Sequence, residues 1–212
     1  MATLSFRGDI DPKNIQETYR YYTKRHPRYK LIRHKTVGAA LIDLEQVDTR
    51  EKYLALIKGK NGGASHAKRA RAKGYTVAEI DRNAYVDSIH KINTSCLSRQ
   101  GRPMDVTYQK KVDYFESLDH FRYYGIVNGQ GELVAYANLG LFGNFCGFSQ
   151  LIGLRNNDGA MHLLLVEIVS GLIEQRQVRY VMYDTFFGAL PGLRQFKTML
   201  GFRPYRAKYV LL

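Results

Sequence analysis

A long apolar segment constrains the fold more than any other part of this chain. Residues 161–175, MHLLLVEIVSGLIEQ, have the length of a helix and are apolar nearly all round. Their polar interruptions are Glu167, Ser170 and Glu174. Such a helix has no face suited to water, so other elements must cover it on every side. The segment predicts a central, buried helix, which strand candidates at 145–154 and 178–184 flank directly.

Strand patterns around this helix give the order of the second half of the chain. The runs FRYYGIVN and ELVAYANLGLF, joined by NGQG, predict a β-hairpin, because Asn128 and Gly129 tolerate the positive φ of a tight turn. After the strand at 178–184, a short helix closed by Gly201 leads to the final strand, YRAKYVLL. The order β-β-β-α-β-α-β predicts an α+β fold.

The first half carries weaker patterns. Strands are predicted at 37–44 and 76–80, and helices after Thr49, after Ser65, over 85–96 and over 108–118. The last two helices are inferred from apolar residues at three-to-four-residue spacing, which places them on one buried face. We expect a single domain over 1–212, with a basic N-terminal portion at 1–75 and a core at 76–212.

The net charge of +13 predicts attraction to phosphates, whether they belong to a nucleotide, tRNA, DNA or an anionic lipid. Two segments concentrate it. Residues 11–35 interleave tyrosines with arginines and lysines, which suits base stacking with phosphate contact or, alternatively, a helix whose tyrosines pack on the domain. Residues 65–73 predict a basic surface helix, which either contacts a polyanion or is simply solvated.

Other classes of protein are disfavoured. No run approaches the roughly 20 apolar residues needed to span a bilayer, and the first residues lack an apolar segment behind a basic start, so we expect a cytoplasmic protein without membrane insertion. Cys96 and Cys146 lie far apart and form no zinc-binding spacing, which predicts no metal site.

The C-terminal order resembles the Gcn5-related N-acetyltransferase (GNAT) superfamily over roughly residues 120–212. The ending FKTMLGF is similar to the superfamily's helix closure, while Tyr183–Asp184 and GLRQFK (192–197) resemble the FemAB-type branch, whose members transfer aminoacyl groups from aminoacyl-tRNA. HAKRARAKGY is similar to a basic helix of that branch. The resemblance implies a largely antiparallel mixed sheet flanked by helices, and an acyltransferase.

The resemblance also implies a place for the donor, either acyl-CoA or aminoacyl-tRNA. GNAT enzymes generally hold pyrophosphate in an (R/Q)xxGx(G/A) loop at a helix N-terminus, where free N–H groups and the helix dipole favour an anion. The matching loop here is RNNDGAMH, whose spacing differs and whose Asp158 adds a negative charge. The predicted donor-binding residues are Arg155, Asn156, Asn157, Gly159 and Ala160.

Acyl transfer to an amine needs a route for the amine proton, a stabilised oxyanion and a proton for the leaving group. Asp184 is the candidate for the first role and Tyr183 for the last. Lys197, which stands where many GNAT enzymes have a tyrosine, is the candidate for oxyanion or phosphate contact. The alternative for Asp184 and Lys197 is a plain salt bridge between strand and helix.

A polar connection stands where GNAT proteins present an acceptor-binding loop. The predicted substrate-side residues are Asn93, Ser95, Arg99, Gln100 and Arg102, with Tyr108 nearby. Arg99 and Arg102 suit a carboxylate or a phosphate. The alternative is that these charges are ordinary exposed loop residues.

Three functions compete. The leading hypothesis is a GNAT-like transferase that moves an acyl or aminoacyl group to the amine of a small molecule or macromolecule. The second is a GNAT-fold protein that modifies nucleic acid, similar to the phage Mom proteins that act on DNA bases. The third is a non-catalytic module that binds a polyanion through its basic face.

Overall fold

The computed structural model describes residues 1–59, 62–99, 102–155 and 158–212, with backbone alone at 99 and 102. The strands are β1 (Ala2–Phe6), β2 (Val37–Asp43), β3 (Thr76–Glu79), β4 (Ser98–Arg99), β5 (Arg102–Pro103), β6 (Phe121–Val127), β7 (Leu133–Leu141), β8 (Phe145–Gly153), β9 (Tyr180–Thr185) and β10 (Arg203–Leu211). The helices are α1 (Pro12–Thr23), α2 (Arg50–Leu56), α3 (Gly63–Ala72), α4 (Val86–Thr94), α5 (Val106–Gln109), α6 (Ala160–Gln175) and α7 (Pro191–Met199), and a 3-10 turn (Arg82–Tyr85) precedes α4.

A mixed sheet organises the molecule, and within the described chain it has eight strands in the order β1-β10-β2-β9-β8-β7-β6-β3. The β1/β10 and β8/β9 pairs are parallel, whereas the other neighbours are antiparallel. Because α6 connects β8 to β9, this crossover explains their parallel pairing. The predicted α+β fold, with a largely antiparallel mixed sheet flanked by helices, is confirmed.

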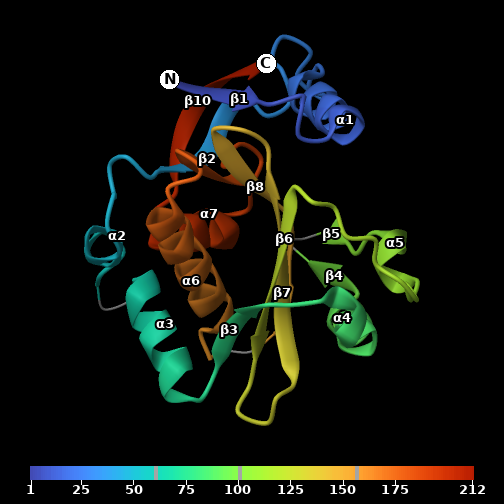
Figure 1. Ribbon diagram of the computed structural model, residues 1–212, viewed down its shortest axis with the longest axis vertical. Helices are drawn as coiled ribbons and strands as arrows, with labels where there is room; N and C mark the ends of the chain where they lie inside the picture. Colours follow the sequence, from blue (N-terminus) through green and yellow to red (C-terminus); the bar gives the residue numbers. More distant parts are fainter. Residues whose placement is uncertain (60–61, 100–101, 156–157) are drawn as a thin grey trace.

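Helices cover both faces of this sheet. Helices α2, α3, α6 and α7 lie on one face, and α4 and α5 lie on the other (Figure 1). Helix α6 is central, as predicted, and the large apolar core forms between it, α3 and the sheet. Helix α1 packs through Ile15 on a second cluster built by β1, β10 and the start of β8. The two chain ends lie near each other beside β1 and β10 (Figure 1).

Strands β8 and β9 part soon after they meet, and this opening positions the candidate site. Their register runs from Phe145↔Tyr180 to Gly147↔Met182 and ends there. Just beyond, β8 carries an extra residue, Ser149, against β7, and β9 carries an extra residue against β2. A bulge bends its strand and increases the twist. Two adjacent bulges therefore account for the splay between the strands.

One predicted helix is wrong. The pattern over 108–118 predicts a helix, but α5 ends at Gln109, and the chain then runs irregularly to residue 120. Side chains from elsewhere hold its backbone: Asn83 Oδ1 accepts from the Phe115 N–H at 2.8 Å, and the Tyr123 hydroxyl accepts from the Leu118 N–H at 3.1 Å. These bonds replace the helical ones, so Phe115 and Leu118 are partly buried without a helix, whereas Val112 is 41% exposed.

Two other expectations concern single features. The closure by Gly201 is confirmed, because φ is 88° there and the Phe202 N–H donates to the Lys197 carbonyl at 3.1 Å. In the part of the chain that the structure describes, no helix is both long and apolar enough to cross a bilayer.

Candidate functional site

A pocket with a volume of about 770 Å³ lies at the splay. Its walls come from α1, the segment before β2, the region of α5, Phe121 of β6, Phe142 before β8, residues 148–152 of β8, and the end of β9. Beyond Gly147, the edge of β8 that faces β9 has no strand partner in the described chain, so its backbone groups are open to a bound molecule. Pockets of this size hold small molecules or the reactive end of a larger one.

Asp184 stands at the mouth of this pocket. It occupies the β9 bulge with φ of 53°, a left-handed conformation that asparagine and aspartate tolerate better than most residues. Its side chain is 52% exposed and forms an ion pair with Lys35, whose own side chain is only 14% exposed. Lys35 is fixed in turn, because its carbonyl accepts from the Tyr209 hydroxyl at 2.9 Å. The structure thus presents a solvent-accessible carboxylate with one cation beside it.

Tyr183 lines the same pocket but is half-buried among aromatic rings. The centroids of Phe148 and Phe202 each lie 5.8 Å from its own. Burial raises the pKa of the Tyr183 phenol, and the Asp184 carboxylate adds to the shift. Burial also raises the pKa of Tyr22, another lining residue. Both phenols therefore stay protonated at neutral pH and can donate a hydrogen bond or a proton.

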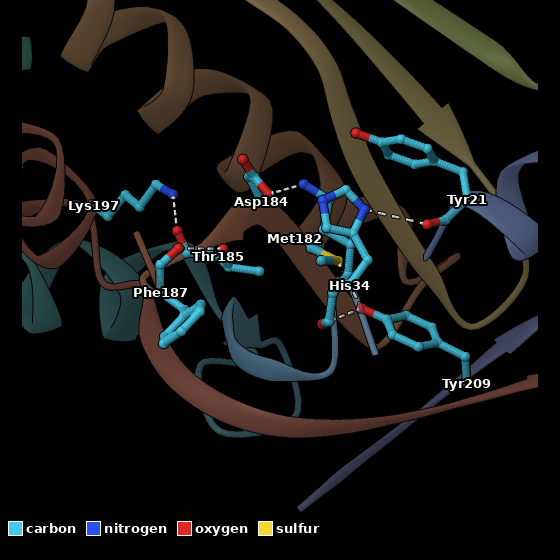
Figure 2. Close-up of polar contacts among 9 residues, drawn as sticks. Tyr21, His34, Met182, Asp184, Thr185, Phe187, Lys197 and Tyr209 are labelled. Atoms are coloured by element: carbon cyan, nitrogen blue, oxygen red, sulfur yellow. Dashed lines mark hydrogen bonds and ion pairs between the residues drawn. The ribbon is translucent and has the colours of Figure 1, made fainter. Parts of the chain in front are cut away.

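Lys197 corrects one expectation. We expected it to pair with Asp184, but its side chain is fully buried and its Nζ donates to the Thr185 carbonyl oxygen at 2.8 Å (Figure 2). The Nζ also lies 4.7 Å from the centroid of the Tyr183 ring. Lys197 does not pair with Asp184, because Lys35 forms the ion pair with that carboxylate instead. Lys197 lies behind the end of β9, outside the lining of the pocket.

This burial predicts how stability depends on pH. Burial lowers the pKa of Lys197 from 10.5 to about 8. Between these values the unfolded chain binds a proton that the folded chain lacks, so this residue makes the free energy of unfolding rise with pH, by roughly 2–3 kcal/mol. Lys197→Met should remove that rise, as measured by urea unfolding at pH 7, 8, 9 and 10. Lys208→Met, at an exposed position on β10, is the control. An unchanged slope in Lys197→Met would contradict the assignment.

The predicted donor loop leads to a second pocket, of about 480 Å³, at the N-terminus of α6. Gly159 and Ala160 line it, together with His66 and Arg69 from α3 and with His162. Arg155 lies apart, where its Nη2 donates to the Ser98 carbonyl at 3.0 Å. Asp158 is paired with Lys73, which neutralises its charge. The predicted residues Asn156 and Asn157 lie outside the described residues.

Two stacked histidines make this second pocket sensitive to acid. The rings of His66 and His162 lie 4.4 Å apart. Burial lowers the pKa of His162 from 6.5 to about 4, and His66 and Arg69 add to the shift. As the pH falls from 6.5 toward 4, His162 is protonated in the unfolded chain but stays neutral in the folded chain. His162 therefore lowers the free energy of unfolding over this pH range.

We expect His162→Phe to lose less stability than the wild type when pH falls from 7 to 4.5, by roughly 2 kcal/mol. Phenylalanine keeps a ring against His66 and Phe196 but cannot bind the proton. Thermal unfolding at half-unit pH steps measures the difference in stability between the variant and the wild type. Both proteins contain the same carboxylates, so the contribution of these groups to the pH dependence cancels in the comparison. Parallel stability curves would count against the lowered pKa of His162.

The predicted acceptor residues are not gathered in one place. Tyr108 lines the pocket at the splay, and its hydroxyl lies 3.4 Å from Gln150 Nε2, which donates to it. The Asn93 side chain accepts from the Tyr136 hydroxyl at 2.7 Å, and the Ser95 hydroxyl donates to the Ile92 carbonyl at 2.7 Å. Arg99 and Arg102 pair through the backbone of β4 and β5. Gln100 lies outside the described residues, so these roles stay predictions.

Sequence reasoning missed several residues of the pocket. Lys35 is 149 residues from Asp184, and nothing in the local pattern marks it as a partner. Tyr22 was included only within a basic, tyrosine-rich segment, not as part of a site. Gln150 and Ser149 lie in a predicted strand, but the bulge that turns this part of β8 toward the pocket has no signature in a single sequence.

Known proteins match this chain in structure but not in sequence. No family model matches the sequence, and no curated protein matches it. Among solved structures, FemX matches with a TM-score of 0.64 and 9% identity, covering 94% of this chain and 67% of FemX. The chain has a GNAT/FemAB-like fold. This fold confirms the resemblance inferred from the C-terminal residues.

Two other matches share the GNAT/FemAB-like fold. L-PGS from Bacillus licheniformis has a TM-score of 0.52 and 16% identity over 80% of this chain. The C-terminal domain of a proposed lysylphosphatidylglycerol synthetase from Agrobacterium fabrum has a TM-score of 0.54 and 18% identity, again over 80% of this chain. This chain spans 58% of the length of each of these two structures.

Proposed function

We propose that this chain is a transferase that moves an acyl or aminoacyl group from an activated donor to an amine, with the reaction centred on Asp184. One observation carries the proposal: an accessible carboxylate and a protonated tyrosine face one pocket where two strands of a GNAT/FemAB-like sheet part. Support comes from the FemX match and from the synthetases, whose name joins lysine to phosphatidylglycerol.

The chemistry follows from the groups in the pocket. The amine nitrogen forms a bond to the acyl carbon, and the bond from that carbon to the donor's oxygen or sulfur breaks. Asp184 takes the amine proton, and Tyr183 supplies a proton to the leaving atom. Solvent exchange then returns the proton from Asp184 to Tyr183. Lys35 orients the Asp184 carboxylate through their ion pair.

The pocket at the start of α6 suits a phosphate of the donor. Arg69 lines it, and the first N–H groups of a 16-residue helix carry partial positive charge. Acyl-CoA and aminoacyl-tRNA both carry phosphates, so both remain donor candidates. The matches with FemX and with the domain of a proposed lysylphosphatidylglycerol synthetase favour the aminoacyl donor.

A second candidate is a non-catalytic module that binds a polyanion. The aromatic rings packed around Tyr183 favour this candidate, because they fill one side of the splay. Radiolabelled aminoacyl-tRNAs and acyl-CoAs, incubated with the protein and a panel of amines, separate the two. Formation of a labelled amide supports the transferase. Donor binding without transfer to any amine, including adenine bases in DNA, would favour the module.

A further inference from the structure

A basic, aromatic surface adjoins the pocket at the splay. We call the exposed side chains of residues 20–35 the 20–35 surface. From residue 18 to residue 42 the chain has no aspartate or glutamate. Over the same residues it has seven cations, which are Arg20, Lys24, Arg25, Arg28, Lys30, Arg33 and Lys35. The surface therefore carries a concentrated positive charge with no local acidic residue to balance it.

Most cations of this surface also lack acidic partners elsewhere in the described chain. Among the described residues, Lys35 is the one member that forms an ion pair. The basic helix α3 differs, because Arg71 pairs with Glu167 and Lys73 pairs with Asp158. Of the two basic segments seen in the sequence, the first keeps more of its cations available to an external anion.

Two tyrosines on this surface are exposed and held in place. Tyr21 and Tyr29 are each 45% exposed. The Tyr21 ring lies 4.9 Å from His34, and the Tyr29 ring lies 5.2 Å from Phe187, in both cases edge to face. The neighbouring tyrosines, Tyr19 and Tyr22, pack on Phe6 instead. Of the two alternatives for these tyrosines, packing on the domain applies to Tyr19 and Tyr22, whereas Tyr21 and Tyr29 stay exposed.

Each exposed ring has a cation beside it. Lys24 Nζ lies 4.5 Å from the centroid of the Tyr21 ring, and the Arg28 guanidinium carbon lies 5.4 Å from that of Tyr29. A ring beside a cation suits a nucleotide, because the base can stack while the cation meets its phosphate. The arrangement occurs twice, which fits consecutive nucleotides of one strand.

The surface is continuous with the pocket. Tyr21 and Lys35 line the pocket as well, and Lys35 pairs with Asp184. Figure 2 draws Tyr21, His34 and Asp184 in one view, and His34 Nδ1 lies 3.3 Å from the Tyr21 carbonyl oxygen. A strand bound along the 20–35 surface would therefore bring its terminal nucleotide to the carboxylate.

We propose that the 20–35 surface binds the single-stranded 3′ end of an RNA and leads its terminal ribose into the pocket at the splay. The choice of RNA rests on the proposed function, because an aminoacyl ester is carried on a terminal ribose. A membrane is the competing partner, since Leu31 is fully exposed on this surface. One leucine is a small apolar contact for a bilayer, whereas the paired rings and cations match a nucleotide strand.

Binding is tested by fluorescence anisotropy with a 5′-labelled RNA hairpin that ends in four unpaired 3′ nucleotides, compared with the same hairpin made blunt. We expect the unpaired end to tighten binding at least tenfold, since two stacked bases are gained. Tyr29→Ala should weaken it by roughly 5- to 150-fold, as the loss of one stacked base predicts. Tyr29→Phe should bind as the wild type does, because the ring remains.

Charge is tested with a matched pair of variants. Arg28→Ala/Lys30→Ala should reduce the slope of log affinity against log salt by on the order of 1.4, as two lost contacts to single-stranded phosphates predict. Arg206→Ala/Lys208→Ala makes the same charge change on exposed β10 positions, whose neighbours Ala207 and Tyr209 face α1. This control should keep the wild-type slope.

Three outcomes would overturn the inference. Equal affinity for the blunt and unpaired hairpins excludes recognition of a 3′ end. If the test and control variants lose the same amount of salt dependence, net charge alone explains the change in RNA binding. The third outcome combines two results: the protein binds phosphatidylglycerol vesicles and Leu31→Ala abolishes this binding, while Tyr29→Ala leaves RNA affinity unchanged. These results together would assign the surface to a membrane. RNA binding without any amide formation supports this inference and counts against the transferase alone, so the two can fail separately.

Discussion

Replacing Asp184 with asparagine should lower the rate of amide formation by about 100-fold or more, the usual effect of losing a positioned proton acceptor. Asparagine has the same shape, and it tolerates the left-handed φ of 53° at this position. It cannot take the amine proton, and it gives Lys35 no charge to pair with. The defect should therefore lie in turnover, with the chain still folded. Initial rates at saturating donor measure it.

Asp9→Asn provides the matched control, because Asp9 is also an exposed carboxylate in an ion pair, with Arg7 at 2.6 Å, but lies outside the lining of the pocket. Both variants remove one exposed charge, so both should leave the free energy of unfolding nearly unchanged. The control should keep wild-type turnover. Turnover of Asp184→Asn within threefold of the wild type would remove Asp184 from the reaction.

Gly159→Ala, at the start of α6, should cause a large loss of stability. A Cβ there would lie 2.4 Å from the His66 carbonyl oxygen, which is backbone and can move only if α3 moves. The residue also has φ of 85°, which alanine adopts at a cost of about 1 kcal/mol. Adding the collision, we expect a loss of at least about 3 kcal/mol, as overpacking against fixed atoms predicts.

Gly131→Ala separates the two contributions. Gly131 has φ of 80°, but its added Cβ would meet nothing within 4 Å. It should therefore show the conformational cost alone, about 1 kcal/mol. Urea unfolding of both variants and the wild type gives the comparison. Equal losses at the two positions would show that α3 yields freely at Gly159, and that the contact between α3 and the start of α6 is loose.

Most of the second half of the fold was predictable because its signals are local. The hairpin of β6 and β7 follows from alternating strands around a turn, and the burial of α6 follows from its apolar circumference. The first half was less predictable. The pattern over 108–118 has helical spacing, yet bonds from Asn83 and Tyr123 hold that segment in another conformation. Strand β1 was not predicted, and its partner β10 lies far from it along the sequence.

The candidate site divides in the same way. Tyr183 and Asp184 stand out in the sequence because they end a buried strand before a loop. The surroundings of these two residues cannot be read from the sequence. Lys35, 149 residues away, pairs with Asp184, and Lys197 donates to the Thr185 carbonyl. Ion pairs between distant residues depend on strand order, which no local pattern encodes. The same holds for the basic residues, since only the folded chain shows which of them meet a carboxylate.

The sequence by itself determined the central apolar helix, the strands on either side of it and the position of Tyr183 and Asp184 at a strand end. These features follow from hydrophobic periodicity and turn chemistry, which act over a few residues. Only the tertiary structure decided that β8 and β9 part at two bulges, that Lys35 meets Asp184, and that the other cations of residues 20–35 form no ion pair in the described chain. These features depend on which distant segments the sheet brings together, and that pairing is settled by packing of the whole chain.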